Sequence, residues 1–473
     1  MSSIWKTKTP SQIADAAEHT QLKKNLTAFD LAALGIGSVV GTGIFVATGK
    51  GAHLAGPGVL LSFIIAAFTC GFCALTYSEL ACMFPVAGST YTYSYVAFGE
   101  VIAWIIGWDL MLEYLVSASA VASGWSTTFI GLIQSAGVKL PKALLTPLIT
   151  LDAEGRIVRG GIIDVPAVVI TLLITWVLYI GIRESARINN IIVGVKVAVI
   201  LLFVFLGVRH VSLANLKPLM PFGWKGVMAG AAIIFFAYIG FDAVSTAAEE
   251  TKNPKRDVPL GLMLCLGVVI VLYVAVAFVL TGIVPYKQID VGNALPAALA
   301  GIGIRWGGAL VATGAIVGMV STLLVTLYGQ IRIFMVMSRD GLLPPAFAKI
   351  HPRHRTPHLC TWITGIATAL IAGSFNLDII IEMCNIGTLF AFILVSVGVI
   401  VLRKTRPEVE RKFKTPGVPF TPLVTIAFCF YLMASLMKVT WLRFGGWLVI
   451  GLVIYFVYGV RHSKLQKAAQ EGR

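Results

Sequence analysis

Lys196, Glu113 and Asp242 are ionisable residues that lie inside or at the edge of long apolar stretches of this sequence. Lys196 lies about nine residues into an apolar run, which in a helix places it roughly 13 Å from the start of the run. A lysine at such a depth in a membrane costs about 2.5 to 3.5 kcal/mol, and buried ionisable residues of this kind usually have a function. Burial also disfavours the charged form of a lysine, so the group can exchange a proton near neutral pH. We therefore predict that Lys196 carries or senses a proton.

Glu113 and Asp242 are the acidic counterparts of this lysine. Glu113 lies in the middle of an apolar run, and Asp242 follows a glycine that interrupts another run. Each of them either balances the charge of Lys196 and handles the proton, or forms hydrogen bonds between helices. We predict a proton-coupling site of Lys196, Glu113 and Asp242.

Four glycines interrupt the first apolar run, over the segment Leu34 to Phe45. Each costs roughly 1 kcal/mol of helix propensity relative to alanine. Irregular backbone at membrane depth is tolerated only where it is buried in protein or lines a polar cavity. The start of a half-helix after such a break presents free N–H groups to a carboxylate. We predict an anion-binding backbone site at Val40, Gly41, Thr42 and Gly43, the alternative being glycines that allow close helix packing.

A second break is predicted about 200 residues later, in the segment Phe235 to Glu250. An apolar helix runs into Gly240 and Asp242 and then resumes with small and hydroxylated residues. Unpaired carbonyl groups before Gly240 are suited to accept hydrogen bonds from a bound ammonium group.

The composition is that of an integral membrane protein. Of the 473 residues, 57% are hydrophobic and only 12% are charged, with a mean hydropathy of +0.87, whereas soluble domains have about 25% charged residues. The first 27 residues are polar, and the first apolar stretch is long and lacks a small-residue cleavage site, so we expect no cleaved signal peptide.

Twelve apolar runs are long enough to be transmembrane helices, since ~20 residues span a hydrocarbon core of about 30 Å. We therefore predict an all-α protein with twelve spans at residues 28–50, 56–83, 99–134, 164–182, 187–208, 226–249, 261–284, 306–338, 360–374, 378–402, 420–437 and 442–460.

The net charge of +15 is a signal of membrane topology. With the N-terminus inside, the cytoplasmic segments carry 23 of the 37 lysines and arginines and the opposite loops carry 12. This asymmetry predicts that both termini are cytoplasmic. It also predicts anionic lipid head groups, rather than nucleic acid, as partners of the basic residues.

The two breaks suggest two related halves. Spans 1 to 5 (28–208) and spans 6 to 10 (226–402) have similar lengths, and an odd number of spans makes the second unit inverted relative to the first. Interrupted segments at the first position of both halves indicate a binding site near the middle of the membrane. We expect residues 1–27 and 461–473 to be cytoplasmic segments, and helices 11 and 12 (420–460) to serve packing or dimer formation.

Other motifs are weak. Cys70 and Cys73 form a C-x-x-C pair inside an apolar run, without a second pair or a nearby histidine, so we expect neither a metal site nor a disulfide framework. His351, His354 and His358 are interleaved with arginines and prolines, which favours a basic loop. No Walker sequence, catalytic constellation or cofactor motif is present, so we expect no enzymatic activity and no cofactor.

Long segments of the chain resemble the amino acid–polyamine–organocation superfamily, in particular its cationic amino acid transporter-like branch with bacterial proton-coupled permeases. The resemblance is carried by residues 35–45, 235–250, 253–259, 338–344 and 385–389. It implies a LeuT-like fold of two inverted five-helix repeats followed by two additional helices.

The resemblance also implies roles for individual residues. The substrate α-carboxylate would bind at Val40 to Gly43, and the substrate ammonium would bind the carbonyls of Phe236, Ala237 and Ile239, with the Phe236 ring as a gate and Asp242 beside them. Lys196 would occupy the place of the sodium ion of related transporters, so we expect H⁺ as the coupling ion and no sodium site. The alternative is a structural lysine bonded to carbonyls of span 1.

We therefore expect a plasma-membrane permease that takes up L-amino acids with protons by alternating access. The alternatives are an amino acid exchanger and a non-transporting sensor or channel. Cationic substrates would need an acidic residue at the far end of the pocket, and the sequence identifies none unambiguously. Similar bacterial members also take small neutral or branched-chain amino acids, so neutral or broad uptake is slightly favoured. A homodimer or a small membrane-protein partner is left open.

Overall fold

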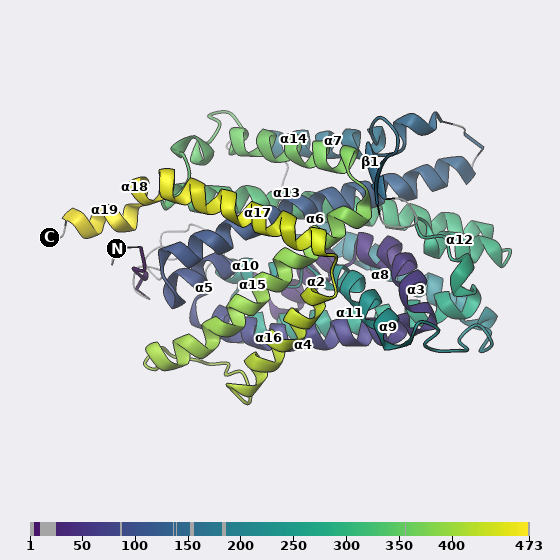
Figure 1. Ribbon diagram of the computed structural model, residues 1–473, viewed down its shortest axis with the longest axis horizontal. Helices are drawn as coiled ribbons and strands as arrows, with labels where there is room; N and C mark the ends of the chain where they lie inside the picture. Colours follow the sequence, from purple (N-terminus) through teal and green to yellow (C-terminus); the bar gives the residue numbers. More distant parts are fainter. Residues whose placement is uncertain are drawn as a thin grey trace.

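The structure is a computed structural model, which describes residues 4–9, 25–85, 88–135, 137–138, 140–151, 156–181, 186–354 and 356–471. Most of the predicted N-terminal segment 1–27, with Lys23 and Lys24, therefore lies outside the described residues. The described chain is predominantly helical, and its long helices run side by side along the longest axis of the molecule (Figure 1).

The helices match the predicted apolar runs closely. In chain order the longer elements are α2 (Ala28–Val39), α3 (Thr48–Ala55), α4 (Val59–Met83), α5 (Ser89–Ala97), α6 (Glu100–Ser135), α7 (Val165–Ile180), α8 (Ala186–Gly207), α9 (Gly223–Ile234), α11 (Pro254–Ile283), α12 (Ala294–Gly301), α13 (Arg305–Arg339), α14 (His358–Ser374), α15 (Leu377–Thr405), α16 (Phe420–Ala434), α17 (Lys438–Ile454) and α19 (Lys464–Glu471). The short helices α10 (Ala243–Thr246) and α18 (Val460–His462) lie between them.

Eight helical segments of the described chain are long and apolar enough to cross a membrane. Four shorter apolar helices, α2, α7, α14 and α16, coincide with further predicted runs. One of the eight segments, Gly43–Met83, contains both the second half of predicted span 1 and span 2, which meet at Gly56. Gly56 has a φ of 64°, a conformation that favours glycine, and the chain turns here between α3 and α4.

Two helices lie in segments that the sequence analysis treats as loops. Helix α5 precedes α6, and α12 lies between α11 and α13. Both helices are too short to give the hydropathy signal of a membrane span. Helix α5 is in addition only weakly apolar. Helix α11 begins at Pro254, seven residues before the predicted start at 261. A proline in the first turn of a helix is tolerated because its missing N–H would have no partner there.

The segment between α6 and α7 contains a short hairpin. Strand β1 (Ile149–Leu151) pairs antiparallel with β2 (Ile157–Arg159), with Thr150 opposite Val158. Residues 152–155, at the tip, lie outside the described residues.

Both described ends of the chain lie at the same end of the bundle, at the left in Figure 1, and we call it the terminal end. There Lys8 forms an ion pair with Asp340 at 2.8 Å. Glu100 is fully buried and accepts hydrogen bonds from Tyr95, Tyr455, Ser463 and Gln466. Ser463 and Gln466 belong to the C-terminal segment, so the hydrogen bonds to Glu100 connect that segment to the start of α6.

A second buried carboxylate, Glu79 near the end of α4, joins three elements. Arg403 at the end of α15 contacts both of its oxygens, at 2.9 and 2.7 Å, and the backbone N–H of Thr415 donates to it at 2.7 Å. The Arg411 side chain lies 3.4 Å away. Paired arginine contacts of this kind are the stronger ion pairs in proteins.

We predict that Glu79→Gln lowers the free energy of unfolding by about 3 kcal/mol, because it leaves two arginines without a buried partner for their charge. The measurement is the apparent melting temperature of the detergent-solubilised protein. The matched control is Glu410→Gln, since the pair of Lys255 and Glu410 is exposed and joins the same region. Exposed pairs contribute little, so equal losses in the two variants would contradict the role given to Glu79.

Candidate functional site

The first predicted break is present between α2 and a short π-helical turn at Gly43–Ala47. Val40 has an extended backbone, with φ −75° and ψ 95°, and its N–H donates to the carbonyl of Ile36 at 2.8 Å. Val40 therefore closes the first half-helix and does not offer a free N–H, contrary to the prediction. The second half-helix starts at Thr42 and Gly43, and the N–H groups of a first helical turn have no partner within their own helix.

The second predicted break is also present. Helix α9 continues into a 3₁₀ turn at Phe235–Tyr238, Ile239 is extended, and Gly240 has a φ of 107°. The Phe236 carbonyl accepts the N–H of Ile239 at 3.3 Å, which leaves one of its two lone pairs for another donor. The chain resumes as α10 after Asp242.

The two breaks lie against each other. A Cβ atom added to Gly43 would be 2.3 Å from the Cα atom of Ala237, so only glycine permits this contact between the two backbones. A Cβ atom added to Gly240 would be 2.7 Å from the Ser38 hydroxyl oxygen. The start of the second half-helix thus lies against the interrupted backbone of the other segment.

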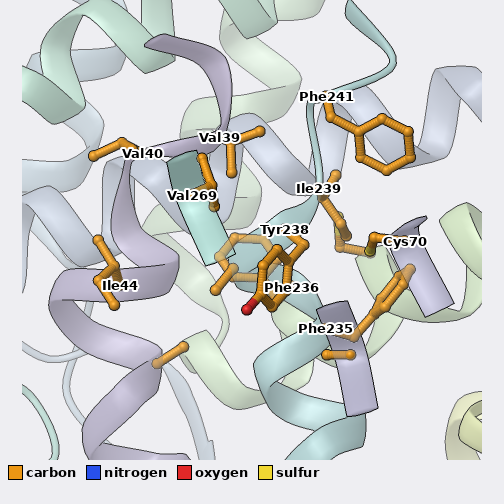
Figure 2. Packing of buried hydrophobic residues seen from close by; sticks show 14 of the residues in the cluster. Val39, Val40, Ile44, Cys70, Phe235, Phe236, Tyr238, Ile239, Phe241 and Val269 are labelled. Atoms are coloured by element: carbon orange, nitrogen blue, oxygen red, sulfur yellow. The ribbon is translucent and has the colours of Figure 1, made fainter. Parts of the chain in front are cut away.

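Apolar side chains from both segments surround this contact. Figure 2 shows Val40 and Ile44 of the first segment in one cluster with Phe236 and Ile239 of the second. The Phe236 ring is buried, with 6% of its surface exposed. The surroundings would suit an apolar substrate side chain next to polar backbone groups.

Lys196 is completely buried on α8. Its Nζ atom donates to the carbonyl of Gly37 at 2.5 Å and to the hydroxyl of Thr322 at 2.8 Å. The Thr322 hydroxyl also lies 3.4 Å from the carbonyl of Val40. The ammonium group therefore lies between the end of α2 and α13, which are predicted spans 1 and 8, directly behind the first break.

Gly318 makes room for the lysine. A Cβ atom added to this glycine of α13 would lie 2.9 Å from Cγ of Lys196. The aliphatic stem of Lys196 therefore packs closely against α13 along its length.

Glu113 and Asp242 are close enough to interact electrostatically. Both are buried, each with 4% of its surface exposed. Thr388 of α15 contacts the Glu113 carboxyl, and the Asp242 carboxyl lies near the backbone N–H groups of Gly240 and Ala243. The structure thus brings the two acids together on one side of the second break, whereas the contacts described for Lys196 lie at the first.

Three polar residues of this region were not among the predicted site residues. The Thr322 hydroxyl accepts a hydrogen bond from Lys196. The Asn385 side chain donates to the Ala232 carbonyl at 2.6 Å. Asp109 is buried one helical turn from Glu113. The signal that could have found them is the same in each case, a polar side chain within an apolar run.

The cysteine motif lies beside the second break, where Figure 2 shows Cys70 next to Ile239, and the three histidines lie before α14 and at its start. Cys70 and Cys73 are buried free thiols on α4, and the sulfur atoms of Cys73 and Cys429 are 3.9 Å apart. The Nδ1 atom of His351 accepts the backbone N–H groups of Arg353 and His354 at 3.2 and 3.3 Å, so it is not open to a metal ion. Within the described residues there is no group of three or more metal-ligating side chains.

Comparison with known proteins adds independent evidence. Residues 26–458 match the amino acid permease family. The chain is 48% identical to the branched-chain amino acid permease BcaP of Bacillus subtilis over 96% of this chain and 97% of the relative. It is 46% identical to the methylthioribose transporter of the same organism, over 99% and 100% of the two chains.

A more distant relative is a chloroplastic cationic amino acid transporter of Arabidopsis thaliana, 34% identical over 93% of this chain and 89% of the relative. These relatives are transporters and not enzymes. Together with the two facing helix breaks, the match over nearly the whole length establishes that this chain is a membrane protein of the amino acid permease family, within the amino acid–polyamine–organocation superfamily.

Proposed function

We propose that this protein is a secondary active transporter of the plasma membrane that takes up neutral, branched-chain L-amino acids together with protons. The observation that carries the proposal is the contact between the two breaks, where the start of a half-helix lies against the interrupted backbone at Ala237. A zwitterionic amino acid has a carboxylate for N–H donors and an ammonium group for carbonyl acceptors. Gly41, Thr42 and Gly43 would hold the carboxylate, and Phe236, Ala237 and Ile239 would hold the ammonium group.

The pattern of helix contacts supports a twelve-span fold with two inverted repeats of five. If spans 1 to 5 correspond to spans 6 to 10, α4 pairs with its counterpart α11, α6 with α13, and α7 with α14. The contact of α2 with α11 also has its equivalent in the contact of α9 with α4. Such reciprocity is expected when two similar units pack about a twofold axis in the membrane plane.

The orientation follows from the distribution of charge. Loops at the terminal end carry the larger share of lysines and arginines, so we place both termini in the cytoplasm. Anionic lipid head groups would neutralise the basic residues at that surface.

The substrate side chain is inferred from the apolar cluster and from the relatives. Ile44, Phe236 and Ile239 surround the contact between the breaks with hydrocarbon, and the relative of 48% identity is named for branched-chain amino acids. A second candidate is methylthioribose, because the relative of 46% identity transports it. This sugar derivative has no carboxylate for the half-helix, so the geometry of the breaks favours an amino acid.

A thermal-shift screen of the detergent-solubilised protein tests the substrate. We expect L-leucine, L-isoleucine and L-valine to raise the apparent melting temperature, since a ligand at 100 times its Kd stabilises the folded state by about 2.7 kcal/mol. The D-enantiomers, L-lysine, L-arginine and methylthioribose complete the screen. A shift with methylthioribose and none with any L-amino acid would overturn the amino acid proposal.

Transport of the selected ligand into liposomes separates uptake from exchange and from sensing. Accumulation that needs no internal substrate and increases when the outside is made acidic supports proton symport. Uptake only into vesicles preloaded with amino acid would indicate an exchanger, and binding without movement a sensor.

We predict that Lys196→Met abolishes the stimulation of uptake by a pH gradient, because the ammonium group that bonds Gly37 and Thr322 is lost. Lys196→Arg tests the alternative of a structural cation, since arginine keeps a permanent charge. Lys225→Met is the matched control, because Lys225 is exposed at the start of α9. Equal stimulation of the wild type and Lys196→Met would exclude a coupling role for this lysine.

A further inference from the structure

Asp109 on α6 is a buried carboxyl group that the proposed transport mechanism does not use. Its side chain is fully buried, and neither of its oxygens has a hydrogen-bond partner among the described residues. Most buried polar groups in proteins are paired, so an unpaired carboxyl group in the middle of a helix bundle calls for a functional explanation.

The surroundings of Asp109 require it to be protonated in this conformation. Gly387 of α15 packs directly on it, since a Cβ atom at Gly387 would be 2.9 Å from Oδ1 of Asp109. An ionised carboxylate without partners in an apolar interior costs far more free energy than a protein can supply, so the group takes up a proton instead. The contact with α15 thus seals a neutral carboxylic acid away from water.

The other titratable groups near Asp109 are arranged as a short series. Glu113 lies four residues further along α6, about 6 Å at a rise of 1.5 Å per residue, and it interacts in turn with Asp242 at the second break. Asp109 itself interacts with Glu113, and Cys384 of α15 lies near both acids. Asp109 is nine residues from Glu100 at the terminal end, so it lies between that end and Glu113.

The arginines on the neighbouring helices interact with other residues. Arg332 of α13 interacts with Tyr114, and Arg443 of α17 interacts with Glu382. Tyr91 of α5 packs against Gly107, two residues before the acid. Helices α7 and α14 contain no acidic residue, lysine or arginine.

We propose that Asp109 is a second proton-binding residue of the transport cycle, located between the substrate site and the terminal end. The inference rests on the proposed proton symport. In the described conformation Asp109 holds its proton against α15. When α15 and α6 separate, water reaches the carboxyl group, its O–H bond breaks, and the proton passes to the Glu113 carboxylate or to water. In the reverse step the Asp109 carboxylate takes up a proton again.

This arrangement couples proton movement to conformation. The group can ionise only in a state in which α15 no longer covers it, and the covered state forms again only after a proton has bound. Gly387 allows α15 to pack directly on the Asp109 carboxyl group and to exclude water from it. Any larger residue at this position would displace the carboxyl group or the helix.

The test uses the full-length protein in liposomes that contain a trapped pH-sensitive dye. A mixture of the twenty L-amino acids is added outside, and acidification of the lumen reports proton entry. We expect Asp109→Asn to slow acidification by about 100-fold or more, since positioned proton-transfer groups contribute about 10²- to 10⁴-fold. Exchange of radiolabelled amino acids, which needs no net proton movement, should be retained.

Glu382→Gln is the matched control, since Glu382 is another buried acid near Gly387 on α15 and, unlike Asp109, accepts a described hydrogen bond, from Thr440. Its acidification rate should equal that of the wild type. Wild-type protein that exchanges amino acids without acidification would overturn the proton symport and the role of Asp109 together. Wild-type rates in Asp109→Asn would overturn the role of Asp109 alone.

A second measurement needs no variant and covers the case in which Asp109→Asn fails to fold. Carbodiimides modify protonated carboxyl groups in apolar surroundings, so the wild-type protein should carry an adduct on Asp109 after treatment near neutral pH. Peptide mass spectrometry distinguishes Asp109 from Glu113. Modification of Glu113 without any at Asp109 would contradict a protonated, exchangeable Asp109.

Discussion

The need to satisfy every backbone N–H and C=O group inside a membrane is the constraint on which the rest of this structure depends. Two of its spans violate helical regularity, at Val40 to Gly43 and at Ile239 to Asp242. Neither break could face lipid, because unpaired backbone groups in hydrocarbon cost several kcal/mol each. They are instead placed against each other in the interior, and the surrounding helices keep them there.

The groups that support the breaks are few and specific. Gly43 and Gly240 allow the two backbones to approach each other. The ammonium group of Lys196 donates a hydrogen bond to the Gly37 carbonyl near the end of α2. It is held between this carbonyl and the Thr322 hydroxyl, directly behind the first break. Under the proposed symport, a change in the charge of this group would act on the backbone that is proposed to bind the substrate.

Charge is distributed differently at the terminal end. There Glu79 and Glu100 are buried, but each is surrounded by donors, two arginines in one case and neutral hydroxyl and amide groups in the other. Asp109 is buried to the same degree without described partners. The contrast separates carboxylates that hold the fold together from one that is available to a proton, and hydropathy alone does not distinguish them.

The sequence by itself determined the membrane environment, the helical architecture, the approximate limits of the spans and the two breaks, because hydropathy and glycine placement act locally. It also identified Lys196, since a lysine in an apolar run is conspicuous. It placed Val40 wrongly among the free donors and overlooked Thr322 and Asp109. The N–H of Val40 is taken up by the Ile36 carbonyl of its own helix, which only the backbone geometry shows. The other two points depend on helices far apart in the chain, which only the tertiary structure brings together: Thr322, one partner of Lys196, is 126 residues from it, and the glycine that packs on Asp109 is on α15. Local patterns fix which residues are unusual, and packing between distant helices fixes what each of them touches.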